Sequence, residues 1–169
     1  MENLIFLLTA SLVLYQSSKK PRKTIIGDTH CSVLFPSEAV FEFTQSDEGD
    51  QLYFSEYTSQ NVSYGVVCGR LNSKLALEEA QDVMTVYLNR LRRPFQALYN
   101  TGIDLCRDWN HSKDWVKMVD YWQDENNLDW KVKGYTDGQI VAVLYVQNIN
   151  EISVEAQDEF LDSFCLEKS

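Results

Sequence analysis

The sequence predicts an α+β fold in which a long helix and a C-terminal helix pack on an antiparallel β-sheet. Three observations predict this class: apolar segments bounded by turn residues recur along most of the chain, one central segment has helical spacing, and a short helical segment comes near the end. The chain has 169 residues, of which 44% are hydrophobic and 12% aromatic. This length corresponds to one domain, and the apolar content is sufficient for a packed core.

The first half of the domain has the pattern of antiparallel hairpins. Two short apolar segments, 31–36 and 39–45, are separated by a Pro-Ser pair, which favours a strand, a turn and a second strand. After a polar turn, aromatic and β-branched residues predict two further strands at 52–57 and 62–71.

The apolar spacing then changes from that of strands to that of a helix. Residues three and four positions apart recur over more than five turns from Leu75, which predicts one amphipathic helix. The apolar positions are Ala80, Val83, Met84, Tyr87, Leu88, Leu91, Phe95 and Leu98. We expect Asn72 or Ser73 to cap its start, Pro94 to kink or end it, and Gly102 to close the segment.

Four more strands are expected after this helix, because short apolar segments return between polar turns. They cover 103–108, 114–122, 128–135 and 139–147. Asp137-Gly138 is typical of a tight hairpin between the last two. The last strand is apolar on both faces, so we expect it at the centre of the sheet with both faces covered.

A closing helix is expected over 153–164. Its inward positions include Phe160 and Phe164, whereas Asp162 and Ser163 are expected in solvent. The complete layout is an α/β sandwich with one helix on each side of one antiparallel sheet.

Residues 1–23 are expected to lie outside this domain, which then covers 24–169. Leu4 to Tyr15 form a charge-free apolar run that is shorter than the roughly 20 residues of a membrane span and matches the hydrophobic region of a signal peptide. A basic cluster follows at 19–23. A cleaved export signal, an uncleaved membrane-associated segment and a soluble N-terminal element are all compatible with this pattern. The first predicts a periplasmic or secreted protein, and membrane contact is expected only through the uncleaved apolar run.

The formal net charge is −10, and from Thr24 onward 11 basic residues stand against 24 acidic ones. Such a surface repels the phosphates of nucleic acids and anionic lipids, so we expect no nucleic-acid partner. A basic protein partner is compatible with this charge, which also serves solubility by itself.

The domain contains four cysteines, which allow either two disulfides in an oxidising compartment, with three possible connectivities, or buried free thiols. They are Cys31, Cys68, Cys106 and Cys165. Their spacing matches no zinc motif, since structural zinc sites need closely spaced pairs.

Residues that usually carry catalysis are scarce or scattered. His30 and His111 are the two histidines, neither has a second ligand at helical or hairpin spacing, and the sequence has no hydrolase, zinc-protease or phosphate-loop motif. Carboxylates of the second half, such as Asp120 and Asp124, alternate with polar residues and are expected on a solvated face. We therefore predict no catalytic residue, no metal site, no cofactor and no enzyme activity.

Four tryptophans within 22 residues are the feature most typical of a binding surface. They are Trp109, Trp115, Trp122 and Trp130. Strand alternation puts Trp115 on the same face as Tyr121, and Trp122 on the opposite face with Met118. At least one aromatic side chain should then point away from the main core, unless helices cover both faces. The candidate binding residues are Trp115, Tyr121, Trp122 and Trp130.

Four local features of the domain combine into a family resemblance. They are a first strand ending in Phe35-Pro36, tyrosine-rich hairpins over 53–64, the helix start Leu-Ala-Leu-Glu-Glu-Ala at 75–80, and the terminal Glu-Phe-Leu-Asp-Ser-Phe at 159–164. In these features the chain, over Cys31 to Leu166, resembles small exported bacterial domains, many of unknown function, with a fold like that of PsbP, the accessory protein of the oxygen-evolving photosystem. The resemblance implies an accessory or protein-binding module. It implies no catalytic residue, because the matching positions are packing and turn residues.

Two hypotheses for the function follow. The first is a non-enzymatic exported accessory domain that binds a protein partner, a basic one included, as an inhibitor or immunity protein would. The second is a domain that binds a small apolar ligand or a glycan in a pocket between sheet and helix.

Overall fold

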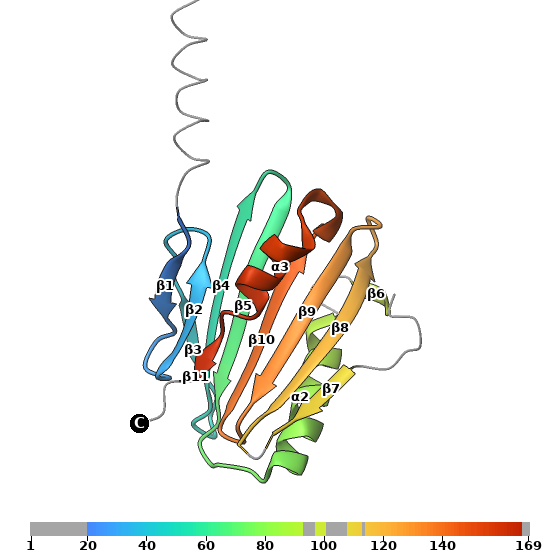
Figure 1. The fold of residues 1–169 in the computed structure, drawn as a ribbon. Helices are drawn as coiled ribbons and strands as arrows, with labels where there is room; N and C mark the ends of the chain where they lie inside the picture. Colours follow the sequence, from blue (N-terminus) through green and yellow to red (C-terminus); the bar gives the residue numbers. More distant parts are fainter. Residues whose placement is uncertain (1–19, 93–96, 101–107, 113, 167–169) are drawn as a thin grey trace, which may run out of the picture.

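The computed structural model describes residues 20–92, 97–100, 108–112 and 114–166 (Figure 1). It confirms the α+β class, with a large antiparallel sheet, a smaller antiparallel sheet and two α-helices in this part of the chain. In spatial order the large sheet contains β3 (Glu42–Gln45), β4 (Gln51–Ser59), β5 (Val62–Arg70), β10 (Ile140–Gln147), β9 (Asp129–Thr136), β8 (Val116–Asp124) and β6 (Ala97–Asn100), and β7 (Asp108–His111) also pairs with β8. The small sheet contains β1 (Arg22–Ile25), β2 (Cys31–Phe35) and β11 (Cys165–Leu166).

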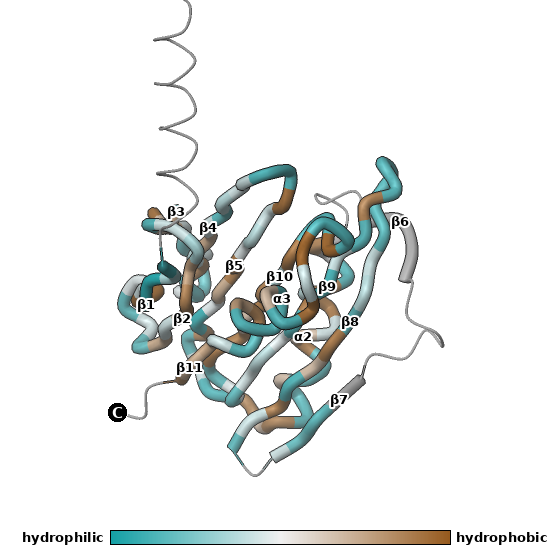
Figure 2. The backbone as a smooth tube through the Cα atoms, turned by 45° about the horizontal axis from the view of Figure 1, so that its top comes forward, coloured by the Kyte–Doolittle hydropathy of each residue, from teal (hydrophilic) through white to brown (hydrophobic). Residues whose placement is uncertain are grey.

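The strand β10 lies at the centre of the large sheet, as its two apolar faces predict. It pairs with β5 on one side and β9 on the other, and every residue from Ile140 to Val146 is buried. A Gly138 with φ of 94° forms the tight turn before it, in agreement with the Asp-Gly signal. Figure 2 shows hydrophobic residues along the central strands and hydrophilic ones at the β4–β5 and β8–β9 hairpin tips.

The helix α2 (Leu77–Arg92) covers one face of the large sheet. Its buried Met84 and Leu88 pack with Met118 and Val143 in one core cluster. Gly134 on β9 makes this close approach possible, because a Cβ atom there would lie 2.6 Å from the Sδ atom of Met84.

The other face of the large sheet is covered by α3 (Val154–Leu161) and by the small sheet, with the short 3₁₀ turn η1 (Ile149–Glu151) leading into α3 (Figure 1). Val33 and Phe35 of the small sheet pack with Phe160 of α3 and Leu144 of β10 in a second core cluster. The prediction of one helix on each side is thus confirmed, whereas the prediction of one sheet is wrong.

The small sheet accounts for the main differences between the predicted and the observed strands in the first half of the domain. The strands at 31–36 and 39–45 do not form a hairpin: the former is β2, whereas β3 begins only at Glu42 and belongs to the large sheet. Arg22 and Lys23, expected in a linker, lie in β1 opposite Phe35 and Leu34. The β2–β11 pairing joins segments from opposite ends of the chain, and local spacing carries no signal for such a contact.

The central helix is shorter than its apolar spacing predicts. Its described part is Leu77–Arg92, and 97–100 form the edge strand β6, so Leu98 is a strand residue. Pro94 and Gly102 lie outside the described residues. Neither Asn72 nor Ser73 caps its start, because α2 begins only at Leu77; Asn72 instead donates from its backbone N–H to Asp50 and from its side-chain amide to Glu48 in the β3–β4 turn. The predicted strand at 103–108 lies outside the described residues except for Asp108.

The closing helix largely follows the prediction. The hydroxyl of Ser153 caps it by accepting from the backbone N–H of Ala156 at 3.2 Å. Phe160 is buried and Asp162 exposed, as predicted. Phe164 is half-buried rather than buried, and Ser163 is also half-buried, because its hydroxyl accepts a 2.9 Å hydrogen bond from the backbone N–H of Leu34. Neither of the described α-helices is long and apolar enough to cross a membrane. The apolar run at 4–15 lies outside the described residues.

Candidate binding surface

Strand β8 separates the candidate aromatic residues onto two faces, as the alternation predicts. Tyr121 is 36% exposed and Trp115 is half-buried, both on the α3 side of the large sheet. Trp122 and Trp130 are 0% and 3% exposed, and they pack in the core cluster on the α2 side. In the β7–β8 pairing Trp109 is opposite Met118; its side chain is not among those described.

The two buried tryptophans are structural residues. The indole N–H of Trp122 donates to Asp120 at 2.9 Å and that of Trp130 donates to Asp124 at 3.0 Å. Their rings lie 6.3 Å apart, and Trp130 also packs on the ring of Tyr145 at 5.2 Å. Trp122 and Trp130 were predicted to contact a partner, but both side chains are too deeply buried to do so.

The carboxylates that receive these indole bonds are buried too, contrary to the expected solvated face. Asp120 and Asp124 are 5% and 3% exposed. Desolvation raises the pKa of Asp124, but hydrogen bonds from the Leu128 backbone and the Trp130 and Gln147 side chains outweigh it, so the pKa is lowered. Aspartates on the inward face of β8 are tolerated because the neighbouring tryptophans satisfy them.

The opposite face of β8, with the residue directly before it, carries a partly exposed row of alternate residues, here named the β8 strip: Trp115, Lys117, Val119 and Tyr121. Cations of the same face lie close to aromatic rings in this region. The Nζ atom of Lys117 is 5.2 Å from the ring of Tyr135, and that of Lys131 is 5.9 Å from the ring of Tyr121. The strip therefore combines aromatic surface with charge.

A buried ionic network attaches α3 beside the β8 strip. Lys131 and Lys133 on β9 are 6% and 5% exposed, and both donate to Asp158 of α3, at 2.9 and 2.8 Å. Lys133 also donates to Asp162 at 2.8 Å, and Lys117 of the strip pairs with the same carboxylate.

The pKa directions agree with this pairing. Burial lowers the pKa of Lys133, but its bonds to Asp158 and Asp162 outweigh this effect and raise it. Desolvation acts to raise the pKa values of Asp158 and Asp162, and the lysines outweigh it and lower both. Lys133, Asp158 and Asp162 are therefore charged at neutral pH, and the network holds α3 at a defined position on the sheet.

A half-open pocket of about 870 Å³ lies at one end of the β8 strip, next to the small sheet. Its apolar wall consists of Trp115, Tyr135, Ile140, Phe164 and Leu166. Its charged and titratable lining includes His30, Arg70, Lys74, Lys117, Asp114, Asp137, Asp162 and Cys165. The hydroxyl of Tyr135 donates to the carbonyl of Leu161 at the end of α3, and its ring packs on that of Phe164 at 4.9 Å, so these contacts hold Tyr135 in the wall.

The remaining candidate residues are the histidines and the cysteines. His30 and His111 are both exposed, and the Nε2 atom of His111 lies 2.6 Å from the amide oxygen of Gln81. Within the described ranges no group of three His, Cys, Asp or Glu residues is placed to hold a metal ion. Cys31 and Cys68 are buried cysteines in the thiol form and Cys165 is an exposed one, whereas Cys106 lies outside these ranges.

The sequence pointed to Trp115 and Tyr121 but missed the residues that frame them. Lys131 and Lys133 alternate on β9, and Asp158 and Asp162 are one turn apart on α3, so both pairs have the spacing of a shared face. The spacing of the two lysines and of the two aspartates can be read from the sequence. The sequence does not show that this face of β9 meets this face of α3, because that contact depends on how distant elements pack.

Comparison with known proteins adds no family to this description. The sequence matches none of the protein-family models, and it matches none of the curated proteins. The function is therefore argued from the β8 strip and the adjoining pocket.

Proposed function

We propose that this protein is a non-enzymatic accessory domain, exported and PsbP-like, that binds a protein partner through the β8 strip and the adjoining pocket. The observation that carries the proposal is the distribution of aromatic residues on β8. Trp122 is satisfied in the core, whereas Trp115 and Tyr121 remain partly open to solvent on the other face. Aromatic side chains of this kind, next to a cavity, are typical anchors of protein interfaces.

The charge of the domain favours a basic partner. The chain carries a formal charge of −10, and the exposed Asp114 and Asp162 line the pocket. The lowered pKa of Asp162 keeps that carboxylate ionised at neutral pH. A negative field of this kind speeds the encounter with a positively charged surface, while the aromatics supply contact area once the complex forms.

The arrangement of helices on both faces of an antiparallel sheet supports the accessory-domain proposal, since it is the layout that the family resemblance implies. Several charged side chains of the described residues are held in structural contacts: Lys131 and Lys133 with α3, Asp137 in a turn, and Asp120 with an indole N–H. These contacts favour a structural role over a catalytic one for these groups, because a general acid or base needs a proton that is available to a substrate.

The test compares capture by the wild-type domain with capture by the double variant Trp115→Ala, Tyr121→Ala. Phe43→Ala is the matched control, because Phe43 is an aromatic residue 54% exposed on the distant edge strand β3. We expect a basic protein, identified by mass spectrometry, whose affinity in calorimetry falls more than about tenfold for the double variant and stays unchanged for the control. Equal affinity for all three proteins, each with native circular dichroism, contradicts the proposal.

The pocket supports a second candidate function, the binding of a small apolar ligand or a glycan. Its volume of about 870 Å³ and its wall of Trp115, Tyr135 and Phe164 suit an apolar or sugar ring. We expect a saturable change in tryptophan fluorescence with such a ligand, and the loss of this change in Trp115→Phe. A change that persists in this variant places the ligand elsewhere.

A further inference from the structure

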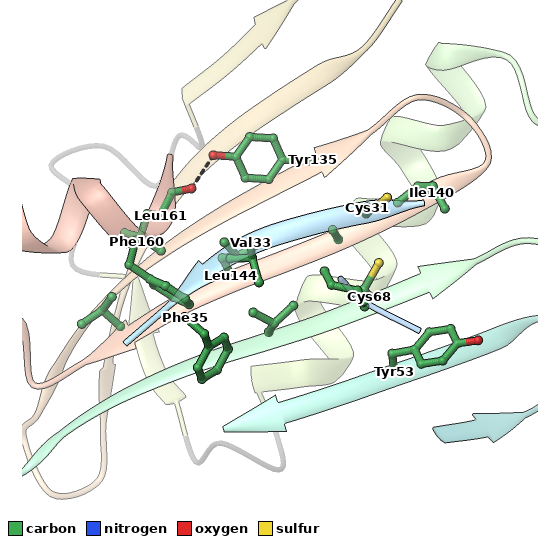
Figure 3. Close-up of a cluster of buried hydrophobic side chains, with 14 of the residues drawn as sticks. Cys31, Val33, Phe35, Tyr53, Cys68, Tyr135, Ile140, Leu144, Phe160 and Leu161 are labelled. Atoms are coloured by element: carbon green, nitrogen blue, oxygen red, sulfur yellow. Dashed lines mark hydrogen bonds between the residues drawn. The ribbon is translucent and has the colours of Figure 1, made fainter. Parts of the chain in front are cut away.

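Two cysteines from different sheets meet in the core. Cys31 is the first residue of β2 in the small sheet, and Cys68 lies on β5 near the middle of the large sheet. They are 1% and 0% exposed and belong to the same core cluster. Figure 3 shows both side chains in the layer between the two sheets.

The two thiols are in direct contact. The Cys68 thiol is hydrogen-bonded to that of Cys31, and the hydroxyl of Thr29 lies within hydrogen-bond reach of Cys68 as well. The same hydroxyl accepts from the backbone N–H of Cys31 at 3.1 Å and donates to the carbonyl of Ile26 at 2.7 Å. The backbone before β2 is thereby held so that Cys31 faces Cys68.

The strand register separates Cys165 from this pair. In the β2–β11 pairing Leu166 is directly opposite Cys31, and Cys165 is opposite Ser32. Directly opposite residues share a face and adjacent residues do not, so Cys165 projects from the other face of the small sheet. Its exposure agrees with this placement.

We propose that Cys31 and Cys68 form a disulfide that links the small sheet to the large sheet when the chain folds under oxidising conditions. A small-molecule disulfide such as oxidised glutathione is the co-reactant. One cysteine thiolate attacks it and releases one glutathione thiol, and the second cysteine thiolate then attacks the mixed disulfide and releases the other. One S–S bond forms as one breaks, and the two protons of the cysteines end on the two glutathione molecules.

Burial determines when this exchange takes place. Hydrogen bonding to Cys31 and desolvation raise the pKa of Cys68, so the thiolate is scarce in the folded domain and the co-reactant has no access to it. The bond therefore forms before the small sheet packs on the large one. Once formed, it resists reductants unless the domain is unfolded.

The disulfide also fixes the shape of the pocket, whether or not a partner binds there. Thr29, His30 and Leu166 line the pocket from the small sheet, and Ile140 and Gln139 line it from the large sheet. A covalent link between the sheets at Cys31 holds these two walls at a constant separation.

The test refolds the full chain with a mixture of oxidised and reduced glutathione, alkylates free thiols and maps the peptides. Trypsin releases Thr24 to Arg70 as one peptide, since no Lys or Arg lies between Lys23 and Arg70. We expect this peptide to be two hydrogens lighter than its reduced form and unalkylated. A glutamate-specific protease then cleaves after Glu38, Glu42, Glu48 and Glu56, and the fragment with Cys31 and the fragment with Cys68 should stay joined until reduced. Cys165 should be alkylated.

Stability measurements complete the test. The oxidised chain should melt about 10 °C above the reduced chain, because the link closes a long loop in the unfolded state. Cys165→Ser should keep this difference, and Cys31→Ala with Cys68→Ala should abolish it. Reductant should act on the oxidised chain only in denaturant. The proposal is overturned if Cys31 and Cys68 are both alkylated after oxidative refolding, or if either one is linked to another cysteine. The peptide map of the wild-type chain gives this result even if a variant does not fold.

Discussion

At the scale of single residues, Asp124 shows how a charged side chain is accommodated in the core. Its carboxylate accepts from the backbone N–H groups of Asn126 and Leu128, from the indole N–H of Trp130 and from the amide of Gln147. One buried group thus joins the β8–β9 turn, a core tryptophan and the end of β10.

Asp124→Asn should reduce the free energy of unfolding by about 2–3 kcal/mol. In asparagine an NH₂ group replaces one of the two carboxylate oxygens. The N–H groups that donated to that oxygen then face another donor and lose their acceptor. Urea unfolding followed by circular dichroism measures the loss. Asp47→Asn, at an exposed turn position, is the control and should be close to neutral.

The lowered pKa values of three aspartates predict how the stability of the fold changes at acid pH. The folded-state pKa values of Asp124, Asp158 and Asp162 lie below their ordinary values, so these groups stabilise the fold above about pH 4 and lose this contribution as pH falls through their folded values. We expect the melting temperature to fall steeply below about pH 4. Asp124→Asn should show a shallower fall than wild type, and an unchanged slope contradicts the assignment.

At the scale of elements, α3 is a two-turn helix attached to the sheet by apolar and ionic contacts together. Phe160 and Leu161 supply the buried apolar side. Asp158 and Asp162 sit over Lys131 and Lys133, whose ammonium groups would otherwise be buried without a counter-charge. Such a short helix has little stability of its own, so its position depends on these contacts.

Asp158→Ala should therefore destabilise the domain more than Lys133→Met. The first variant removes the carboxylate that Lys131 and Lys133 both contact. The second removes a buried charge and puts an apolar side chain of similar length in its place. We expect about 1–2 kcal/mol for Asp158→Ala, since Asp158 is partly exposed to solvent, and a smaller loss for Lys133→Met. Urea midpoints compare the two, and the reverse order contradicts this account of the network.

At the scale of the whole molecule, the small sheet is part of the folded unit, and β1 belongs to it. Strand β1 starts at Arg22, and Ile26, directly after β1, is 0% exposed. The basic cluster at 19–23 therefore extends into a strand, although its composition is that of a linker.

A chain that begins at Lys20 should melt within about 2 °C of the full chain, because it retains β1 and Ile26. A chain that begins at Gly27 loses both and should be less stable by about 2–5 kcal/mol, the usual cost of removing one large buried apolar side chain. Differential scanning calorimetry of the three chains tests this. A large loss for the Lys20 chain means that the apolar run at 4–15 contributes to the fold.

Local spacing in the sequence determined the α+β class, the central position of β10, the closing helix and the separation of Trp115 and Tyr121 from Trp122. These features depend on side-chain periods of 2 and 3.6, which any strand or helix must obey. The tertiary structure alone decided that 97–100 form a strand, that β2 leaves the large sheet to pair with β11, and that Trp130 faces the core. It also decided that Cys31 meets Cys68. Each of these depends on contacts between residues far apart in the chain, whose free energy comes from burial in a common core rather than from local preference.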